Sequence, residues 1–314
     1  MKIVVTGALG HIGSRLVRDL PRKFPAAQIV MLDNLATQRY ASLFNLPPEG
    51  NYRFIEADVL EVDLESLVQG AAAVVHLAAI TDAMASHQNP DMVRRVNLGG
   101  TRRLAEACSG AAVPLLFPSS TSVYGVQQGV VDEDCPARQL SPQSPYAETK
   151  LEEEAILAER AAAGDLRYVI CRLGTIVGTS PGMRFHTAVN KFCWQAVMGT
   201  PLSVWRSATH QMRPYLDLND AIRAIAFTIQ RELFDNRVYN VLTANRTVDD
   251  IVQIIRNHVP DLTVKLVDTE IMSQLSYEVC CQRLKSQGFE FRGNLEHGIA
   301  ETISLLQQSH TRGP

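Results

Sequence analysis

A glycine-rich stretch near the N-terminus limits what this chain can fold into more than any other feature. Residues 4–13 read VVTGALGHIG, with glycines at positions 7, 10 and 13. The β-branched run Ile3–Val5 before the glycines predicts a buried strand. After them, apolar residues recur at helical spacing, at Ile12, Leu16, Val17 and Leu20. The glycines therefore stand where a strand turns into a helix, where a diphosphate binds free N–H groups at the positive end of the helix dipole.

An acidic residue follows at the spacing that a dinucleotide site requires. Asp33 ends the apolar run Ile29–Leu32, twenty residues after Gly13. A carboxylate there accepts hydrogen bonds from both hydroxyls of an adenine ribose and repels a 2′-phosphate, which favours NAD over NADP. Arg39 could soften this preference. The alternative is a glycine-rich turn followed by an unrelated acid.

Composition excludes several other classes of protein. The 314 residues carry a net charge of −3, so nothing favours a nucleic-acid partner. No apolar run approaches the ~20 residues that span a membrane, and a signal peptide is not expected because the glycine-rich turn begins at residue 7. The six cysteines lack C-x-x-C spacing, so we expect reduced thiols, no metal site and a cytoplasmic location.

Strand and helix patterns alternate along the first half of the chain. Extended apolar runs are predicted over residues 52–57, 72–77, 115–117 and 168–171. Helices are predicted from Asn89-Pro90-Asp91 to about Cys108 and from about Ser144-Pro145 to about Ala163. This alternation predicts an α/β fold with a doubly wound parallel sheet.

The regular alternation of predicted strands and helices ends after Gly174, and we expect a second, smaller domain built from discontinuous segments of the chain. The predicted division assigns residues 1–173, rejoined by about 214–241, to the dinucleotide-binding domain. Residues 174–213 and 242–314 then form a substrate-binding domain. A pocket between two such domains is the usual place for a substrate.

Tyr146 and Lys150 carry the candidate chemistry. They are four residues apart near the start of a predicted helix, so they share one face. An unperturbed phenol has a pKa near ~10 and is a poor base, but a neighbouring ammonium and an oxidised nicotinamide would favour the phenolate. Tyr146 could then act as a general base toward an alcohol or sugar hydroxyl. The alternative is a surface tyrosine beside a solvated lysine.

Ser120 is a third candidate, because it ends a predicted strand at the edge where ligands bind in such sheets. It also lies in a Ser/Thr cluster, where turn formation is an alternative role.

Together these residues resemble the extended short-chain dehydrogenase/reductase family, which contains the nucleotide-sugar epimerases and dehydratases. The resemblance covers nearly the whole chain and implies a Rossmann-type fold. The matching motifs are T-G-x-x-G-x-x-G at 6–13, Asp33, Asp58-Val59, H-L-A-A at 76–79, V-N-x-x-G-T at 96–101, S-S-T-S-V-Y-G at 119–125, P-Y-x-x-x-K at 145–150, R-L-x-x-x-x-G at 172–178, R-P-Y-x-D-x-x-D at 213–220 and N-L-E-x-G-I-x-x-T-I at 294–303.

The resemblance implies a role for each candidate. Ser120 would hydrogen-bond the reacting hydroxyl, Tyr146 would take its proton, and Asn97 would support the site. Lys150 would bind the nicotinamide ribose and lower the pKa of the tyrosine. The implied NAD contacts are Gly7, Leu9, Gly10, His11, Ile12, Gly13, Asp33, Asn34, Leu35, Asp58, Val59, Leu77, Ala78, Ala79, Tyr146 and Lys150. The implied substrate contacts are Ser120, Thr121, Thr175, Asn190 and Arg213.

Arg213 matches the position that usually binds the nucleotide diphosphate, a bidentate contact suited to arginine. An ordinary surface arginine is the alternative.

Departures from the family pattern bear on the reaction. Its dehydratases and decarboxylases carry an acid one or two positions after the catalytic Ser or Thr, where this chain has Thr121 and Ser122. With no acid to drive elimination, we expect a nucleotide-sugar epimerase, most simply at carbon 4. The alternatives are a dehydratase, decarboxylase or keto-sugar reductase, or a non-catalytic NAD-binding protein.

Two further sequence features concern the substrate and the assembly. Thr175 stands where many epimerases have a diphosphate-contacting Asn. His186, Asn190 and Lys191 either line the sugar pocket or lie on an amphipathic helix whose core side is Val189, Phe192 and Cys193.

The helix near 89–108 carries arginines and the helix near 145–163 carries glutamates. Family members commonly dimerise through this pair of helices, so we expect a homodimer.

Overall fold

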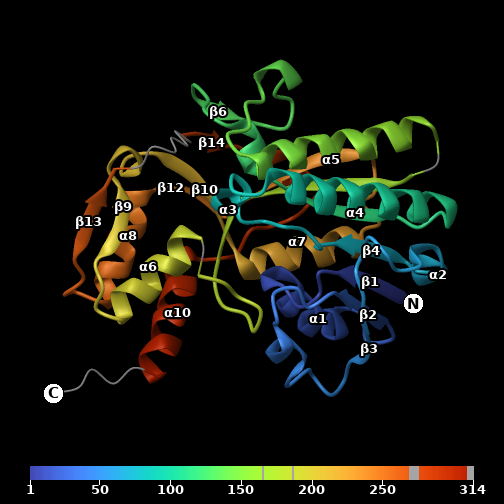
Figure 1. Cartoon of the computed structure of the whole chain (residues 1–314), viewed down its shortest axis with the longest axis horizontal. Helices are drawn as coiled ribbons and strands as arrows, with labels where there is room; N and C mark the ends of the chain where they lie inside the picture. Colours follow the sequence, from blue (N-terminus) through green and yellow to red (C-terminus); the bar gives the residue numbers. More distant parts are fainter. Residues whose placement is uncertain (165, 186, 269–275, 310–314) are drawn as a thin grey trace.

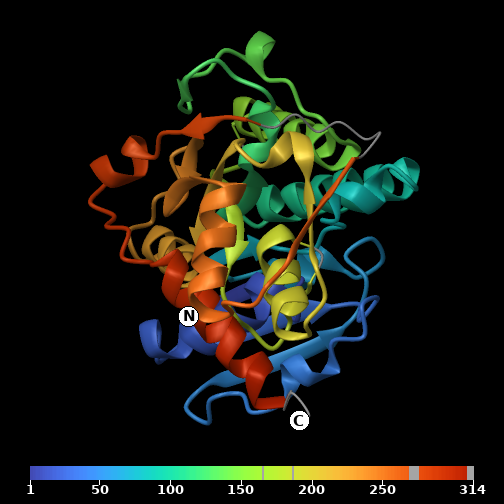
Figure 2. The same ribbon diagram turned by 90° about the vertical axis from the view of Figure 1, so that its left-hand side faces the viewer.

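The computed structural model describes residues 1–164, 166–185, 187–268 and 276–309, and Figures 1 and 2 show the chain from two sides. A seven-stranded sheet in which every pair is parallel forms the larger part, in the order β11-β7-β5-β4-β1-β2-β3. Its strands are β1 (Lys2–Thr6), β2 (Gln28–Asp33), β3 (Asn51–Glu56), β4 (Ala73–His76), β5 (Leu115–Ser120), β7 (Tyr168–Leu173) and β11 (Arg237–Val241). The direction of winding reverses between β1 and β4, and ligands of open parallel sheets bind outside the carboxyl ends at such a point.

Both faces of this sheet are covered by helices, which confirms the predicted doubly wound fold. Ile3 and Val5 point into one core with α1 (His11–Lys23) and α7 (Leu218–Gln230). Val4, between them, points into a second core with α2 (Leu64–Val68), α4 (Pro90–Gly110) and α5 (Pro145–Ala162). This alternation is the period of two that a strand buried on both faces requires.

The starts of α4 and α5 agree with the sequence prediction because both are set by local capping. The side chain of Asn89 accepts a hydrogen bond from the N–H of Met92, and that of Ser144 accepts one from Ala147. Each cap is followed directly by proline, which has no N–H to leave unpaired. The two helices lie side by side in Figure 1.

A smaller body lies at one end of the large sheet (Figure 1). A three-stranded sheet contains β8 (Thr175–Val177), β10 (Met212–Asp217) and β12 (Ala244–Thr247). Two separate pairs of parallel strands are β9 (Leu202–Trp205) with β13 (Val264–Val267) and β6 (Val130–Val131) with β14 (Glu278–Val279). A third core packs among α6 (Ala188–Val197), α8 (Val248–His258) and α10 (Leu295–Ser309).

Short helical turns occur along the whole chain: η1 (Tyr40–Leu43), α3 (Ala83–Ser86), η2 (Thr121–Tyr124), η3 (Ala137–Gln139), η4 (Arg206–Ala208) and α9 (Gln282–Ser286).

Of the segment 214–241, β11 and α7 belong to the large sheet and its first core, while β10 belongs to the three-stranded sheet. The domain division predicted from the sequence stays a prediction.

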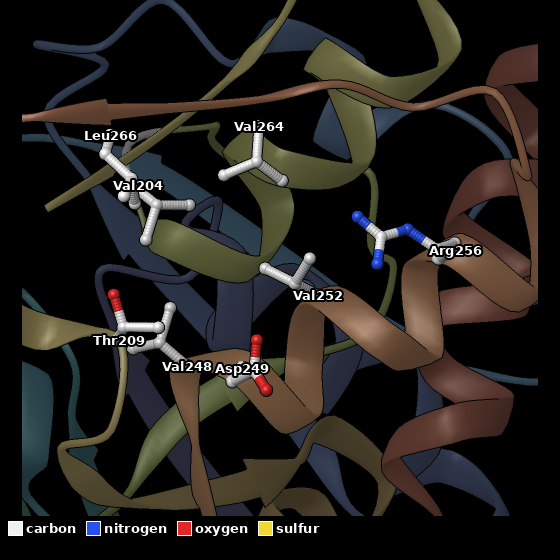
Figure 3. Close-up of a pocket in the computed structure, with 8 residues that line it drawn as sticks. All are labelled: Val204, Thr209, Val248, Asp249, Val252, Arg256, Val264 and Leu266. Atoms are coloured by element: carbon white, nitrogen blue, oxygen red, sulfur yellow. The ribbon is translucent and has the colours of Figure 1, made fainter. Parts of the chain in front are cut away.

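A cavity of about 290 Å³ lies in the smaller body, between the β9–β13 pair and α8 (Figure 3). Its walls are mostly valine and leucine, with Asp249 and Arg256 of α8 at its edge (Figure 3). None of the site residues predicted from the sequence lines it.

No helix in the described ranges is long and apolar enough to cross a membrane. All six cysteines are free thiols, as expected.

Candidate active site

The glycine-rich turn between β1 and α1 forms an open helix N-terminus. Gly7 has φ +64°, and a Cβ there would lie 2.5 Å from the carbonyl carbon of Leu77. At Gly13 a Cβ would lie 2.4 Å from the carbonyl oxygen of Gly7, so the helix packs directly on the turn. The N-cap residue, Gly10, makes no side-chain capping bond, and the first turn of α1 has no acidic residue. The N–H groups of this end suit a phosphate.

Asp33 lies beside this turn, at the end of β2. Its carboxylate accepts hydrogen bonds from the N–H groups of Leu9 and Leu35, each at 3.0 Å. Partial exposure leaves the carboxylate open to a ribose. Asn34 donates to the carboxylate of Asp58 at 2.8 Å, which joins the ends of β2 and β3 as an adenosine pocket requires.

Arg39 also lies beside the turn: a Cβ at Gly10 would be 3.3 Å from its Nη1. Burial and, to a smaller extent, the charge of Arg184 lower the pKa of Arg39 to about 10, while the charge of Asp33 acts in the opposite direction.

The segment after β4 completes the cofactor side. Leu77 donates its N–H to the carbonyl of Thr6 at 3.0 Å, and Ala78 donates to the Thr6 hydroxyl at 3.2 Å. These bonds hold residues 77–79 against Gly7. The ring nitrogen Nδ1 of His11 is hydrogen-bonded to the hydroxyl of Ser180 at 2.8 Å, and the predicted contact of His11 with NAD stays a prediction. Val59 is buried below α4, and its Cγ1 would lie 3.1 Å from a Cβ at Gly100.

Ser120 and Tyr146 meet at the carboxyl end of β5. The Ser120 side chain hydrogen-bonds the Tyr146 phenol, and its oxygen lies 2.8 Å from that of Ser122. Tyr146 as a whole is half-buried, but its hydroxyl end is enclosed. Burial therefore raises the pKa of Tyr146, the charge of Glu153 raises it further, and Ser120 and Arg184 oppose the shift. Tyr146 needs an additional positive charge to act as a base near neutral pH.

Lys150 lies one helical turn after Tyr146. Its Nζ is 4.4 Å from the centroid of the Phe117 ring and 5.9 Å from that of Tyr146. The side chain is buried, and Nζ lies 3.1 Å from Oε2 of Glu153. Sequence and structure thus agree that tyrosine and lysine share one face of α5.

Two buried polar residues shape the floor of the site. Asn97 accepts from the N–H of Ile80 at 2.9 Å and donates to its carbonyl at 3.1 Å. Because Asn97 is fully buried, it positions the backbone after β4, and its predicted catalytic role stays a prediction. Burial and the charge of Lys150 lower the pKa of His76 to about 3, so its imidazole is neutral at physiological pH.

The predicted substrate residues lie on the side of the smaller body. Thr121 donates to the carbonyl of Leu173 at 3.2 Å, and Thr175 pairs with Tyr215 in register. Arg213 donates to Gln211 at 3.0 Å, while its Nε is buried and has no hydrogen-bond partner among the described residues. That free N–H is consistent with a role in binding an anion.

Asn190 is buried, and its amide donates to the backbone carbonyl of Arg184 at 3.0 Å. Its predicted sugar contact stays a prediction, but the amide already holds the preceding loop. Val189, Phe192 and Cys193 belong to the third core and Lys191 is exposed, so the amphipathic alternative describes this part of α6. His186 lies outside the described residues.

Sequence reasoning missed three residues of the site. Arg184 donates to the Thr81 hydroxyl and acts electrostatically on Tyr146. Its Nε is buried and has no hydrogen-bond partner within the part of the chain that the structure describes. Tyr277 is buried with its hydroxyl 3.4 Å from Thr121. Glu153 pairs with Lys150, as described above. The first two come from segments whose packing no local pattern specifies.

The loop carrying Arg184 lies over the glycine-rich turn. The N–H of Gly182 donates to the Ser14 hydroxyl at 3.0 Å, and a Cβ at Gly182 would be 2.2 Å from the carbonyl oxygen of Leu9. The site therefore joins an open helix N-terminus, a ribose acid and a Ser–Tyr–Lys set at one edge of a doubly wound sheet. This combination is typical of enzymes that bind a nicotinamide dinucleotide and act on a hydroxyl group.

Comparison with known proteins gives the family. Residues 3–241 match the NAD dependent epimerase/dehydratase family, and the chain belongs to it. Its cofactor is NAD. An uncharacterized UDP-glucose epimerase, YtcB, of Bacillus subtilis is 32% identical over 78% of this chain and 78% of its own length.

Other similar proteins are named for, or solved with, UDP-glucose or UDP-glucuronic acid. A trifunctional UDP-glucose 4,6-dehydratase, epimerase and reductase, RHM3, of Arabidopsis thaliana is 29% identical over 98% of this chain, which spans about half (47%) of that protein. The UDP-glucuronic acid 4-epimerase of Bacillus cereus, solved with UDP-glucuronic acid and NAD, superposes with a TM-score of 0.87 at 26% identity, covering 99% of this chain and 100% of that one. MoeE5, solved with UDP-glucuronic acid and NAD, gives 0.85 at 28% identity, with the same coverage.

Proposed function

We propose that this protein is an NAD-dependent nucleotide-sugar epimerase that inverts carbon 4. One observation carries the proposal: the residues next to Ser120 present hydroxyl groups where elimination would need an acid. Thr121 bonds the backbone of Leu173, and Ser122 bonds Ser120. Glu153 is the carboxylate whose charge acts on Tyr146, but it is fully buried behind Lys150 and cannot reach a sugar.

Each residue of the site has a distinct role in the proposed reaction. Ser120 hydrogen-bonds the hydroxyl at carbon 4 and aligns it with the Tyr146 phenolate, which takes its proton. Lys150 stabilises that phenolate through its charge. Bound NAD supplies the acceptor and the source of a hydride. Once the keto-sugar has turned over in the pocket and carbon 4 has regained its hydride on the opposite face, Tyr146 returns the proton to the carbon-4 oxygen.

The glycine-rich turn and Asp33 would hold the cofactor's diphosphate and adenine ribose. The fit rests on two features of this structure: the uncapped N-terminus of α1 and the Asp33 carboxylate oriented by two backbone N–H groups. Arg213, with its unpartnered buried Nε, would bind the diphosphate of the substrate.

The substrate we infer is a UDP-hexose or a UDP-hexuronic acid, supported by the similar proteins that bind these compounds. Arg184 is the residue that would separate the two. Its half-buried guanidinium acts on Tyr146 and keeps one N–H unpartnered, so it could pair with a carboxylate at carbon 6.

The test is direct incubation of the protein and NAD with UDP-glucose, UDP-glucuronic acid and UDP-N-acetylglucosamine, followed by proton NMR of the sugar ring. We expect one of them to convert to its carbon-4 epimer without accumulation of NADH at 340 nm. A 4-keto-6-deoxy product would instead establish a dehydratase, and accumulating NADH a dehydrogenase. Arg184→Gln should cost more activity on a uronic acid than on a neutral hexose.

A further inference from the structure

The buried ammonium of Lys150 faces a carboxylate from its own helix. Nζ lies 3.1 Å from Oε2 of Glu153, and the exposed fractions of the two side chains are 4% and 0%. The other oxygen, Oε1, accepts a hydrogen bond from the Thr101 hydroxyl of α4 at 2.6 Å. A carboxylate buried this deeply is stable in its charged form only when it is paired.

The groups around this pair come from four elements. Lys150 also faces the Phe117 ring of β5 and the neutral imidazole of His76 at the end of β4. Tyr146 faces Ser120 and feels two opposite charges, Glu153 and, from the loop after β8, Arg184. Among these groups, Ser120 and Arg184 favour the phenolate form of Tyr146, whereas the negative charge of Glu153 opposes it.

We propose that Glu153 is a positioning residue that acts through Lys150: it fixes the ammonium and offsets part of its charge, and so sets the pH range in which Tyr146 is a base. This inference rests on the proposed role of Tyr146 and Lys150. It assigns a function to a buried acid that makes no contact with substrate or cofactor in the proposed mechanism.

The effect of Glu153 on Tyr146 follows from the choice of counter-ion for Lys150. While Glu153 is charged, the ammonium already has a partner, and a second anion at Tyr146 gains less from it. Without that carboxylate, the Tyr146 phenolate becomes the counter-ion of Lys150. An opposite charge within a few ångströms lowers an acid's pKa by roughly one to three pH units, so removal of Glu153 should favour ionisation of Tyr146.

The test is Glu153→Gln, which removes the charge and can still bond Lys150 and Thr101. The first readout is the 295 nm absorbance titration of Tyr146 in the full chain, isolated by subtracting the same titration of a Tyr146→Phe background. We expect the titration to move to lower pH by roughly one unit. The acid limb of kcat/KM should move by a similar amount.

Matched variants separate charge from packing. Thr101→Val disturbs the same buried contact but keeps the carboxylate, and Glu152→Gln removes an exposed neighbouring charge; both should titrate like the wild type. If Glu153→Gln is too unstable to purify, Glu153→Asp, which withdraws the charge, should shift in the same direction by less. A titration of the Glu153 variant that superposes on wild type, or moves to higher pH, would overturn the proposal. The absorbance readout needs no substrate, so it remains decisive even if the protein proves to be a dehydratase.

Discussion

At the scale of single residues, the proposed reaction depends on how one tyrosine loses its proton in a poorly solvated place. Burial and Glu153 raise the pKa of Tyr146, while Ser120 and Arg184 act in the opposite direction. Lys150 is close enough to supply a further positive charge, and the nicotinamide of bound NAD adds another. Catalysis should therefore require lysine and cofactor together.

Tyr146→Phe tests the proton transfer. The ring remains and only the phenol oxygen is lost, so folding and NAD binding should survive. Turnover should fall by at least the ~10²–10⁴-fold typical of a lost general base. Steady-state kinetics together with NAD binding by calorimetry measure both effects, and near wild-type turnover would contradict the assignment.

Asp33→Ala tests cofactor choice. Wild type should bind NAD much more tightly than NADP, because the carboxylate repels a 2′-phosphate. In the variant that repulsion is gone and Arg39, beside Gly10, can pair with the phosphate, so the two affinities should approach each other. Equal affinities in the wild type would refute the role of Asp33.

The buried His76 should make the free energy of unfolding depend on pH in mild acid. Its folded-state pKa of about 3 lies below the unfolded value of 6.5, so only the unfolded chain takes up this proton as pH falls from 6.5 toward 3. The contribution of His76 to the free energy of unfolding is therefore fully present above about pH 6.5 and is lost as the pH falls below that value. Between pH 7 and pH 5 this one group should lower the free energy of unfolding by about 2 kcal/mol. Urea unfolding at the two values should show a smaller loss for His76→Asn than for wild type. An equal loss in both proteins would count against a depressed histidine.

At the scale of elements, the sequence predicted best where local chemistry decides the outcome. The caps Asn89 and Ser144 set the starts of α4 and α5, and the glycine spacing placed the turn before α1. Short strands such as β8 and β12 were not predicted, because a few residues carry no periodicity and form only through partners distant in sequence. Arg184 and Tyr277 were missed for the same reason, and His186 lies outside the described residues.

Gly7→Ala tests the tight approach between the turn and the end of β4. The added Cβ would meet the Leu77 backbone at 2.5 Å in a left-handed residue, φ +64°. Gly70 is a matched control, because its φ of +71° is similar but a Cβ there has open space. The melting temperature should fall much more for Gly7→Ala than for Gly70→Ala. Similar losses would mean that backbone strain alone accounts for the glycine.

At the scale of the whole molecule, the α4–α5 pair bears on assembly. Two of the charges expected at a subunit interface are paired within one chain, because both terminal nitrogens of the Arg94 guanidinium donate to Glu152, at 2.6 and 2.7 Å. Arg160 of α5 and Glu106 of α4 also lie 3.0 Å apart. These exposed pairs contribute about 0–1 kcal/mol each, so they steady the two helices and leave the homodimer a prediction.

Light scattering coupled to gel filtration tests the homodimer. We expect a mass of twice 34.7 kDa at micromolar concentration, with little effect of Arg94→Gln because that arginine is paired inside its own chain. A mass of one chain would refute the dimer.

The central claim is that a hydride leaves carbon 4 and returns to the same carbon. Its most direct test uses the nucleotide sugar that the protein converts, deuterated at carbon 4 and mixed with excess unlabelled NAD. The account predicts a carbon-4 epimer that keeps its deuterium, with no net NADH. Label appearing in free cofactor, or at another carbon of a deoxygenated product, would contradict it.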